Sequence, residues 1–218
     1  MTKNEIIRCT RCVMDSEADP TITFDAQGHC NYCTEALSQI GSVYLPDEEG
    51  RKQLESMIAM LKKEGEGKPY DCLMGISGGL DSAYLAYLGH QWGLRMLAVH
   101  IDDGYDTPIS RENIRKLCEA AGIDLKVIQP DQQQYDGLTL AYMKAGVPNL
   151  AVPQDNTLFA FLYDQARKNG IRYFLTGGNF ALESILQRGN SHNPMDLVNL
   201  RDINRRFGPT KLNKLKFV

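Results

Sequence analysis

The sequence predicts an α/β protein: a parallel sheet with helices on both faces, preceded by a small four-cysteine unit. From about Lys68 onward, strand-like and helix-like stretches alternate, which is typical of parallel strands joined by crossover helices. A Ser-Gly-Gly turn separates the first of these strands from its helix, and two Cys-x-x-Cys pairs lie upstream. We therefore expect a small domain over residues 1–45 and a larger one over residues 46–218.

The small domain is marked by the pairs Cys9 with Cys12 and Cys30 with Cys33. This spacing is the one that places four thiolates around a zinc ion, and four cysteine ligands leave no open position for chemistry. A unit this small buries little apolar surface. A structural Zn²⁺ would therefore supply its stability. Disulfides are the alternative, disfavoured in a reducing compartment. Between the pairs, residues 21–24 predict a short strand.

The larger domain contains stretches with the apolar pattern of strands and stretches with the apolar pattern of helices. The second strand is an almost continuous apolar run, as expected for a strand covered on both faces. The predicted strands are residues 71–76, 94–101, 125–128 and 171–175, and the predicted helices are residues 83–91, 111–121 and a segment from near Asn156 to Gly170.

The turn after the first strand has the residues of an anion site. Gly78 and Gly79 permit backbone conformations in which successive N–H groups converge, and the helix that follows adds its unpaired N–H groups. Ser77 and Ser82 add hydroxyl donors. A structural turn with Asp81 near a helix N-terminus is the alternative. The predicted binding residues are Ser77, Gly78, Gly79, Leu80, Asp81 and Ser82.

Polar residues also follow the second and fourth strands, and ligands of parallel sheets bind at the carboxyl ends of the strands. A solvated turn is the alternative after the second strand, where the role of Asp103 stays open. Asp155 is either a helix cap or a ligand contact. We expect the ligand to contact His100, Asp102, Gly177, Gly178, Asn179 and Glu183.

Composition sets limits on function. The chain has 218 residues, 43% of them hydrophobic, and a net charge of −3, which argues against a dedicated nucleic-acid binder. The basic stretch near the C-terminus is either a solvated face or a phosphate patch. No segment has the length and apolarity of a signal peptide or a membrane span, so we expect a cytoplasmic protein with no membrane partner.

Residues 75–82, Gly-Ile-Ser-Gly-Gly-Leu-Asp-Ser, resemble the PP-loop of ATP pyrophosphatases. The lysine of the commoner P-loop is missing. The resemblance implies that the loop holds the β- and γ-phosphates of ATP, that AMP is transferred to a substrate oxygen, and that pyrophosphate is released. Asp81 would then hold Mg²⁺. The expected catalytic residues are Ser77, Asp81 and Asp102.

Further motifs resemble the N-acetyl sugar amidotransferases of bacterial surface-glycan (lipopolysaccharide) biosynthesis. They are residues 9–15, 22–25, 28–33, Gly178-Asn179 with Glu183, Asp196 and 199–203. The resemblance implies that ATP activates the acetamido oxygen of an N-acetylated, nucleotide-linked sugar, and that ammonia displaces it to form an acetamidino group. Members of that family usually continue past the end of this chain, and they carry Asp-Asn where Asp102-Asp103 stands.

The ammonia must have a source. No cysteine outside the upstream pairs lies in an evident loop beside a histidine, so we expect a separate glutaminase subunit as partner. A homo-oligomer is an open expectation. The alternatives for function are modification of a tRNA base or a deazaguanine precursor, and non-catalytic nucleotide binding. Residues 187–194 predict a loop over the site, in which Arg188 and His192 contact an acidic ligand or are merely solvated.

Overall fold

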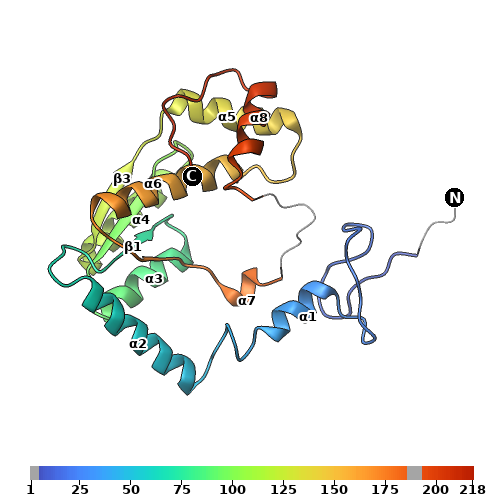
Figure 1. The fold of residues 1–218 in the computed structure, drawn as a ribbon, viewed down its shortest axis with the longest axis horizontal. Helices are drawn as coiled ribbons and strands as arrows, with labels where there is room; N and C mark the ends of the chain where they lie inside the picture. The colour runs from blue at the N-terminus through green and yellow to red at the C-terminus, as the bar shows by residue number, and fades with distance from the viewer. Residues whose placement is uncertain (1–4, 186–192) are drawn as a thin grey trace. The chain divides into compact units, whose positions relative to one another are not determined.

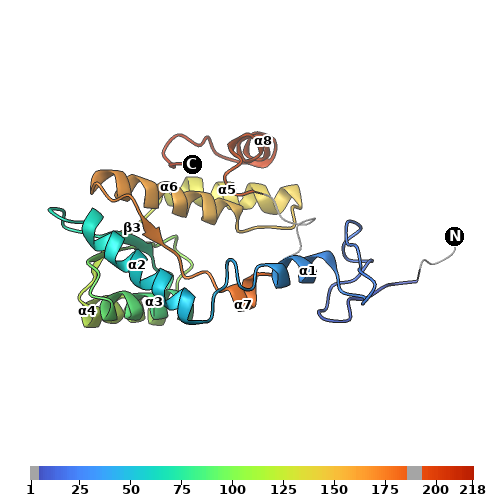
Figure 2. The same ribbon diagram turned by 60° about the horizontal axis from the view of Figure 1, so that its bottom comes forward.

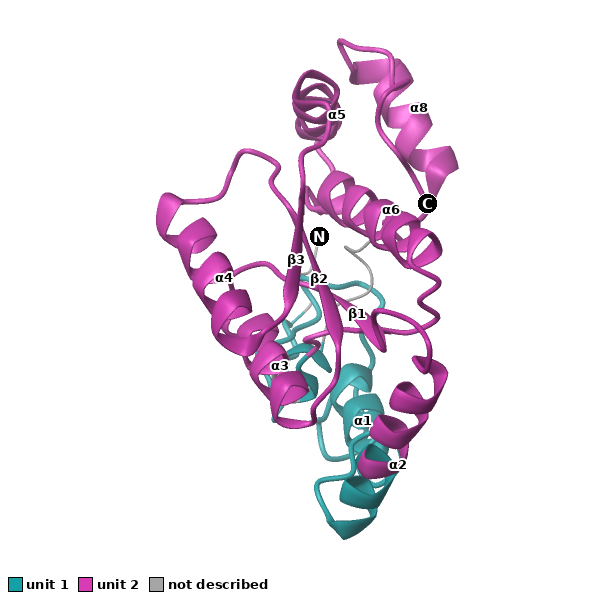
Figure 3. Ribbon diagram, turned by 90° about the vertical axis from the view of Figure 1, so that its left-hand side faces the viewer, with its two compact units in different colours: residues 1–54, 179–192 teal, residues 55–178, 193–218 magenta. Residues whose placement is uncertain are grey.

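The chain forms two compact units in the computed structural model, which describes residues 5–185 and 193–218 (Figures 1 and 3). Unit 1 comprises residues 1–54 and 179–192, and unit 2 comprises residues 55–178 and 193–218. The predicted division between residues 45 and 46 stays a prediction. Arg188 and His192, predicted to lie in a loop over the site, fall outside the described residues.

Unit 2 is built on a parallel sheet, as predicted. Its strands lie in the order β3-β2-β1-β4. In this register Leu73 of β1 lies opposite Leu97 of β2 on one side and Phe174 of β4 on the other. The strands are β1 (Cys72–Gly75), β2 (Met96–Ile101), β3 (Asp124–Ile128) and β4 (Phe174–Leu175). All four match predicted strands, although β4 is much shorter than expected.

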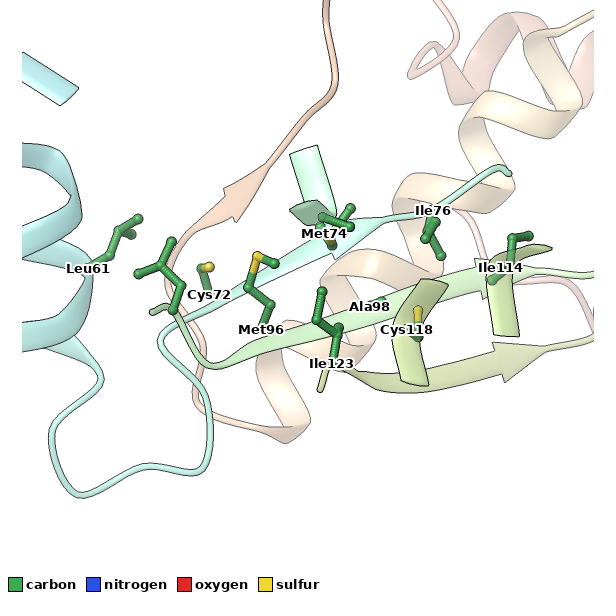
Figure 4. Packing of buried hydrophobic residues seen from close by; sticks show 11 residues of the cluster. Leu61, Cys72, Met74, Ile76, Met96, Ala98, Ile114, Cys118 and Ile123 are labelled. Atoms are coloured by element: carbon green, nitrogen blue, oxygen red, sulfur yellow. The ribbon is translucent and has the colours of Figure 1, made fainter. Parts of the chain in front are cut away.

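Helices cover both faces of this sheet, which confirms the predicted fold class. Figure 3 shows α3 (Leu80–Gln91) and α4 (Pro108–Ala121) on one side of the strands and α6 (Val152–Lys168) on the other. Successive strand side chains alternate between the two faces. Cys72 and Met74 therefore join the cluster on the α3–α4 side (Figure 4), while Leu73 joins the cluster on the α6 side.

A second helical layer extends unit 2 beyond the sheet. Helices α5 (Gln132–Ala145) and α8 (Leu197–Phe207) pack against each other and share a buried cluster with the chain that follows α8 (Figure 2). Two buried amides hold this last stretch. Gln134 accepts from the N–H groups of Asn213 and Lys214, each at 2.9 Å, and Asn156 exchanges hydrogen bonds with Val218.

Unit 1 contains α1 (Asn31–Ser38) and α7 (Phe180–Glu183), while α2 (Glu48–Glu64) begins in unit 1 and ends in unit 2. The strand predicted over residues 21–24 is wrong. Only a single bridge joins Phe24 to Cys30. Side chains take the backbone N–H groups that a strand partner would need, because Thr21 donates to Asp19 and Thr23 donates to Asn31. Among the described residues, no helix is long and apolar enough to cross a membrane.

Candidate functional site

The predicted anion loop connects β1 to α3 and is folded around its own hydroxyl groups. The Ser77 N–H donates to Ser82 Oγ at 3.4 Å, and the Gly79 N–H donates to Ser77 Oγ at 3.3 Å. The Ser82 hydroxyl in turn donates to the Gly79 carbonyl at 3.1 Å. Gly79 is the N-cap of α3 and makes no side-chain capping bond. The positive end of the helix dipole thus faces the loop, an arrangement suited to an anion.

Gly78 is required at its position for two reasons. Its φ of +77° lies in the region that side chains disfavour. A Cβ there would also lie 2.4 Å from Ser110 Oγ and 3.3 Å from the Ile114 side chain. Ser110 and Ile114 belong to α4, so this glycine lets the loop pack directly against that helix.

Gly177, after β4, approaches the same loop from the other side of β1. A Cβ on Gly177 would lie 3.1 Å from the Asp81 carbonyl carbon and 3.1 Å from the Ser82 nitrogen. The backbone at Gly177 therefore approaches the first turn of α3 closely. Asn179 and Glu183 lie in unit 1, where the Asn179 N–H donates to the Glu183 carboxylate at 3.1 Å.

His100 lies beneath the loop rather than at its surface. The side chain is buried, with Nδ1 2.9 Å from the carbonyl oxygen of Ile76, the residue before Ser77. Nε2 lies 3.1 Å from Asp106 Oδ2, but out of line for a hydrogen bond. The imidazole is thus a support for the loop. Its predicted contact with a nucleotide stays a prediction.

The carboxylate pair after β2 is divided between two roles. Asp102 is held by Arg111 of α4 at 3.1 Å and by Gln129 at 3.3 Å. Asp103 is 4% exposed, and its carboxylate has a structural role. Its carboxylate accepts from the Tyr105 N–H at 3.1 Å, the Tyr135 hydroxyl at 2.9 Å and the Gln154 amide at 3.2 Å.

Replacing Tyr135 with Phe should destabilise unit 2 by about 1–3 kcal/mol, because the buried Asp103 carboxylate then lacks a donor. Burial and the bond to Asp103 both raise the pKa of Tyr135, consistent with a hydroxyl that stays a donor. Urea unfolding of Tyr135→Phe beside Tyr163→Phe, a change at a residue that is 50% exposed, measures the effect. Equal midpoints for the two variants would contradict it.

The four upstream cysteines converge, as their spacing predicts. Their sulfur atoms all lie within 4.8 Å of one another. Cys9 Sγ lies 3.9 Å from Cys33 Sγ, and Cys12 Sγ lies 3.6 Å from Cys30 Sγ. Zinc–sulfur bonds of about 2.3 Å in a tetrahedron place sulfur atoms roughly 3.8 Å apart, whereas a disulfide requires about 2 Å. The residues present therefore fit Zn²⁺.

Hydrogen bonds prepare the cluster for a cation. Burial acts to raise the pKa of the Cys9 thiol, but N–H groups of Arg11, Cys12 and Cys30 outweigh it and lower that pKa to about 6. Burial and the three neighbouring thiols raise the pKa of Cys33. The pKa values of the two thiols thus shift in opposite directions. A bound metal would remove this difference, because it keeps all four sulfurs as thiolates.

Sequence reasoning missed three residues that organise the site: Arg111, Tyr135 and Gln154. Arg111 follows Ser110 in the first turn of α4, and the other two come from α5 and α6. None belongs to a recognisable motif. Whether the predicted residues contact nucleotide or metal stays a prediction, although Ser77, Gly78, Gly79, Asp81, Ser82 and Gly177 are brought together around one loop.

Comparison with known proteins adds a family match. The model of the family described as "Queuosine biosynthesis protein QueC" matches residues 71–180, just over half of the chain. A tRNA(Ile)-lysidine synthase from Chlamydia pneumoniae is 30% identical over 142 residues, which cover 63% of this chain and 40% of the relative. The chain thus spans less than half the length of that curated relative.

Solved structures with a similar arrangement include two NAD synthetases. The NH3-dependent enzyme from Campylobacter jejuni subsp. jejuni, in complex with nitrate, is 20% identical with a TM-score of 0.40, covering 56% of this chain and 53% of its own. The glutamine-dependent enzyme from Acinetobacter baumannii, in complex with ADP, is 22% identical with a TM-score of 0.43, covering 57% of this chain and 24% of its own.

Proposed function

The chain belongs to the family of the queuosine biosynthesis protein QueC, within the PP-loop superfamily, and on this premise we propose that it uses ATP to replace a substrate oxygen with nitrogen. The loop of residues 77–82 carries this proposal. It follows β1, which lies between β2 and β4, at the point where the strand order reverses. This is where open α/β sheets bind their ligands.

Activation by adenylation suits the chemistry of this loop. The oxygen of a carboxylate or an amide is a poor leaving group, and transfer of AMP to it creates a good one. Donors around Gly78 and Gly79 would hold the departing pyrophosphate, where charge develops. Mg²⁺ would neutralise part of that charge, and the Asp81 carboxylate is a ligand of the type that Mg²⁺ prefers.

The first candidate acceptor is a nucleobase, either a deazaguanine precursor or a base within tRNA. Two of the comparisons support it, because the matched family's name refers to queuosine and the curated relative's name refers to lysidine in tRNA. The net charge of −3 favours the small-molecule precursor over tRNA.

The second candidate is an N-acetylated, nucleotide-linked sugar. Residues outside the matched range support it, namely the four-cysteine unit with its flanking Cys-Thr-Arg-Cys-Val-Met-Asp and Gly-His-Cys-Asn-Tyr-Cys. These segments resemble the sugar amidotransferases, and the product would be an acetamidino group. The two candidates share the adenylation step and differ only in what carries the oxygen.

For either acceptor, we propose that ammonia comes from a separate glutaminase. All six cysteines of the chain are described. Four form the metal cluster, and the remaining two are buried. Burial raises the pKa of Cys72 to about 12 and also raises that of Cys118. Neither is therefore suited to attack glutamine.

The deciding experiment supplies ATP, magnesium and ammonium chloride and measures pyrophosphate and free phosphate separately. Three classes of acceptor are compared: a carboxylated deazaguanine, unmodified tRNA at low salt, and two nucleotide-linked sugars, UDP-N-acetylglucosamine and a CMP-linked N-acetylated sugar. Pyrophosphate release that depends on one of them identifies its class. ATP binding with no acceptor-dependent pyrophosphate release would contradict the proposed reaction.

A further inference from the structure

Helix α6 begins earlier than the sequence predicts, and this changes the position of Asp155. The helix runs from Val152, with Ala151 as its N-cap and no side-chain cap, rather than from near Asn156. The Asp155 N–H donates to the Ala151 carbonyl at 2.9 Å within the first turn. Of the two roles left open for Asp155, the helix cap is therefore wrong.

The packing of α6 aims this residue at the loop. Leu158 and Leu162 lie against Gly75 at the end of β1, within 4.0 Å of where a Cβ would stand. Asp155 precedes them by three and seven residues, so it shares their face of the helix. At 1.5 Å per residue it lies about 4.5 Å further along the axis than Leu158.

The direction of that step is toward the carboxyl edge of the sheet. Gln154, the neighbour of Asp155, donates its amide to Asp103 beyond the end of β2. The first turn of α6 therefore lies at the same edge as the residues that follow Gly75, which are Ile76 and Ser77 of the loop. Figure 3 shows α6 running alongside β1 on the face opposite α3.

The Asp155 carboxylate is half-buried and has no hydrogen-bond or ion-pair partner among residues 5–185 and 193–218. Burial alone raises its pKa. By contrast, Asp102 and Asp103 are both bonded, and Asp164 on the same helix pairs with Lys168 at 2.7 Å and Lys216 at 2.8 Å. Partial burial disfavours the charged form of a carboxylate that no side chain neutralises, so this group is open to a cationic ligand.

We propose that Asp155 binds the nitrogen nucleophile as an ammonium group and accepts its proton during the transfer step, an inference that rests on the proposed function. A proton passes from the ammonium to the carboxylate, and the nitrogen lone pair forms the bond to the carbon that bears the adenylated oxygen. The carbon–oxygen bond then breaks, AMP leaves with the electron pair, and the nitrogen now bonded to carbon releases its second proton to solvent. Ammonium and a primary amine such as lysine share this chemistry.

The test separates the two half-reactions in Asp155→Asn, Asp155→Glu and the matched control Asp164→Asn. Exchange of labelled pyrophosphate into ATP, with the acceptor found above, reports adenylation. Product formation with ammonium chloride or free lysine reports nitrogen transfer. We expect Asp155→Asn to keep exchange within about twofold and to lose nitrogen transfer by about 100-fold. Asp155→Glu should restore part of the loss, and Asp164→Asn should match wild type in both assays.

Each other outcome has a definite meaning. Equal loss of exchange and transfer would place Asp155 on ATP and overturn the inference, as would no loss at all. A lower melting temperature for Asp155→Asn would indicate a structural role instead, since removing an unpartnered buried charge should leave stability equal or higher. If the wild-type protein catalysed no pyrophosphate exchange with any of the acceptors, the proposed function would be overturned, and this inference with it.

Discussion

Replacing Cys30 with Ser should remove the metal from the protein and unfold unit 1. Cys30 is fully buried, and its N–H donates to Cys9 Sγ at 3.2 Å, so the change affects both a ligand and a bond to another ligand. The buried cluster of unit 1 consists of the cysteines and Tyr32, with few other apolar residues against it. In small four-ligand units, zinc contributes about 10–16 kcal/mol of apparent folding energy.

Metal content and local folding provide the measurement. Wild-type protein, purified without added chelator, should contain about one zinc per chain, and Cys30→Ser should contain almost none. Amide hydrogen exchange should then become fast in α1 while staying slow in β1 and β2 of unit 2. Cys118→Ala removes a buried thiol of unit 2, which lies outside the cluster, and is the control. A Cys30→Ser protein with full zinc content, or with protected α1 amides, would contradict the assignment.

Features encoded by local pattern were predictable. The four cysteines and the Ser-Gly-Gly turn carry their meaning in spacing, and the apolar run of β2 marks a buried strand before any contact is known. The boundary of α6 was not, because Asn156 looks like a helix start, yet its amide is buried and bonds to the Pro194 and Val218 carbonyls. Side-chain bonds to distant backbone leave no local trace.

The same reasoning explains why the sequence could not separate the roles of the two carboxylates that follow β2. Asp102 and Asp103 are equivalent in sequence, and only the donors from Tyr135 and Gln154 reveal that Asp103 is internal. Helices α5 and α8 also escaped prediction, since they depend on each other for burial. The strand predicted over residues 21–24 failed for the opposite reason. These residues are β-prone in composition, but in the part of the chain that the structure describes they have no neighbouring strand to pair with.

Replacing Asp81 with Asn should have opposite effects in the absence and presence of magnesium. Asp81 lies in the first turn of α3, beside the N–H groups that we expect to hold phosphates. A carboxylate there repels bare ATP, so its loss should strengthen binding of ATP in EDTA, by up to about tenfold. With magnesium, the carboxylate instead holds the cation on the phosphates, and Asp81→Asn should lose at least about 100-fold in turnover.

These opposite effects without and with magnesium distinguish a metal-binding role of Asp81 from the helix-dipole alternative. Were Asp81 present only to complement the positive end of α3, its replacement would lower stability by about 0.3–1 kcal/mol and leave the magnesium dependence of ATP affinity unchanged. Calorimetric titration of ATP with EDTA and with magnesium, on Asp81→Asn and on the control Glu119→Gln, gives the answer. The control removes a charge of the same sign from the exposed end of α4, where Glu119 pairs with Arg115. A parallel shift of both affinities would show that Asp81 holds no cation.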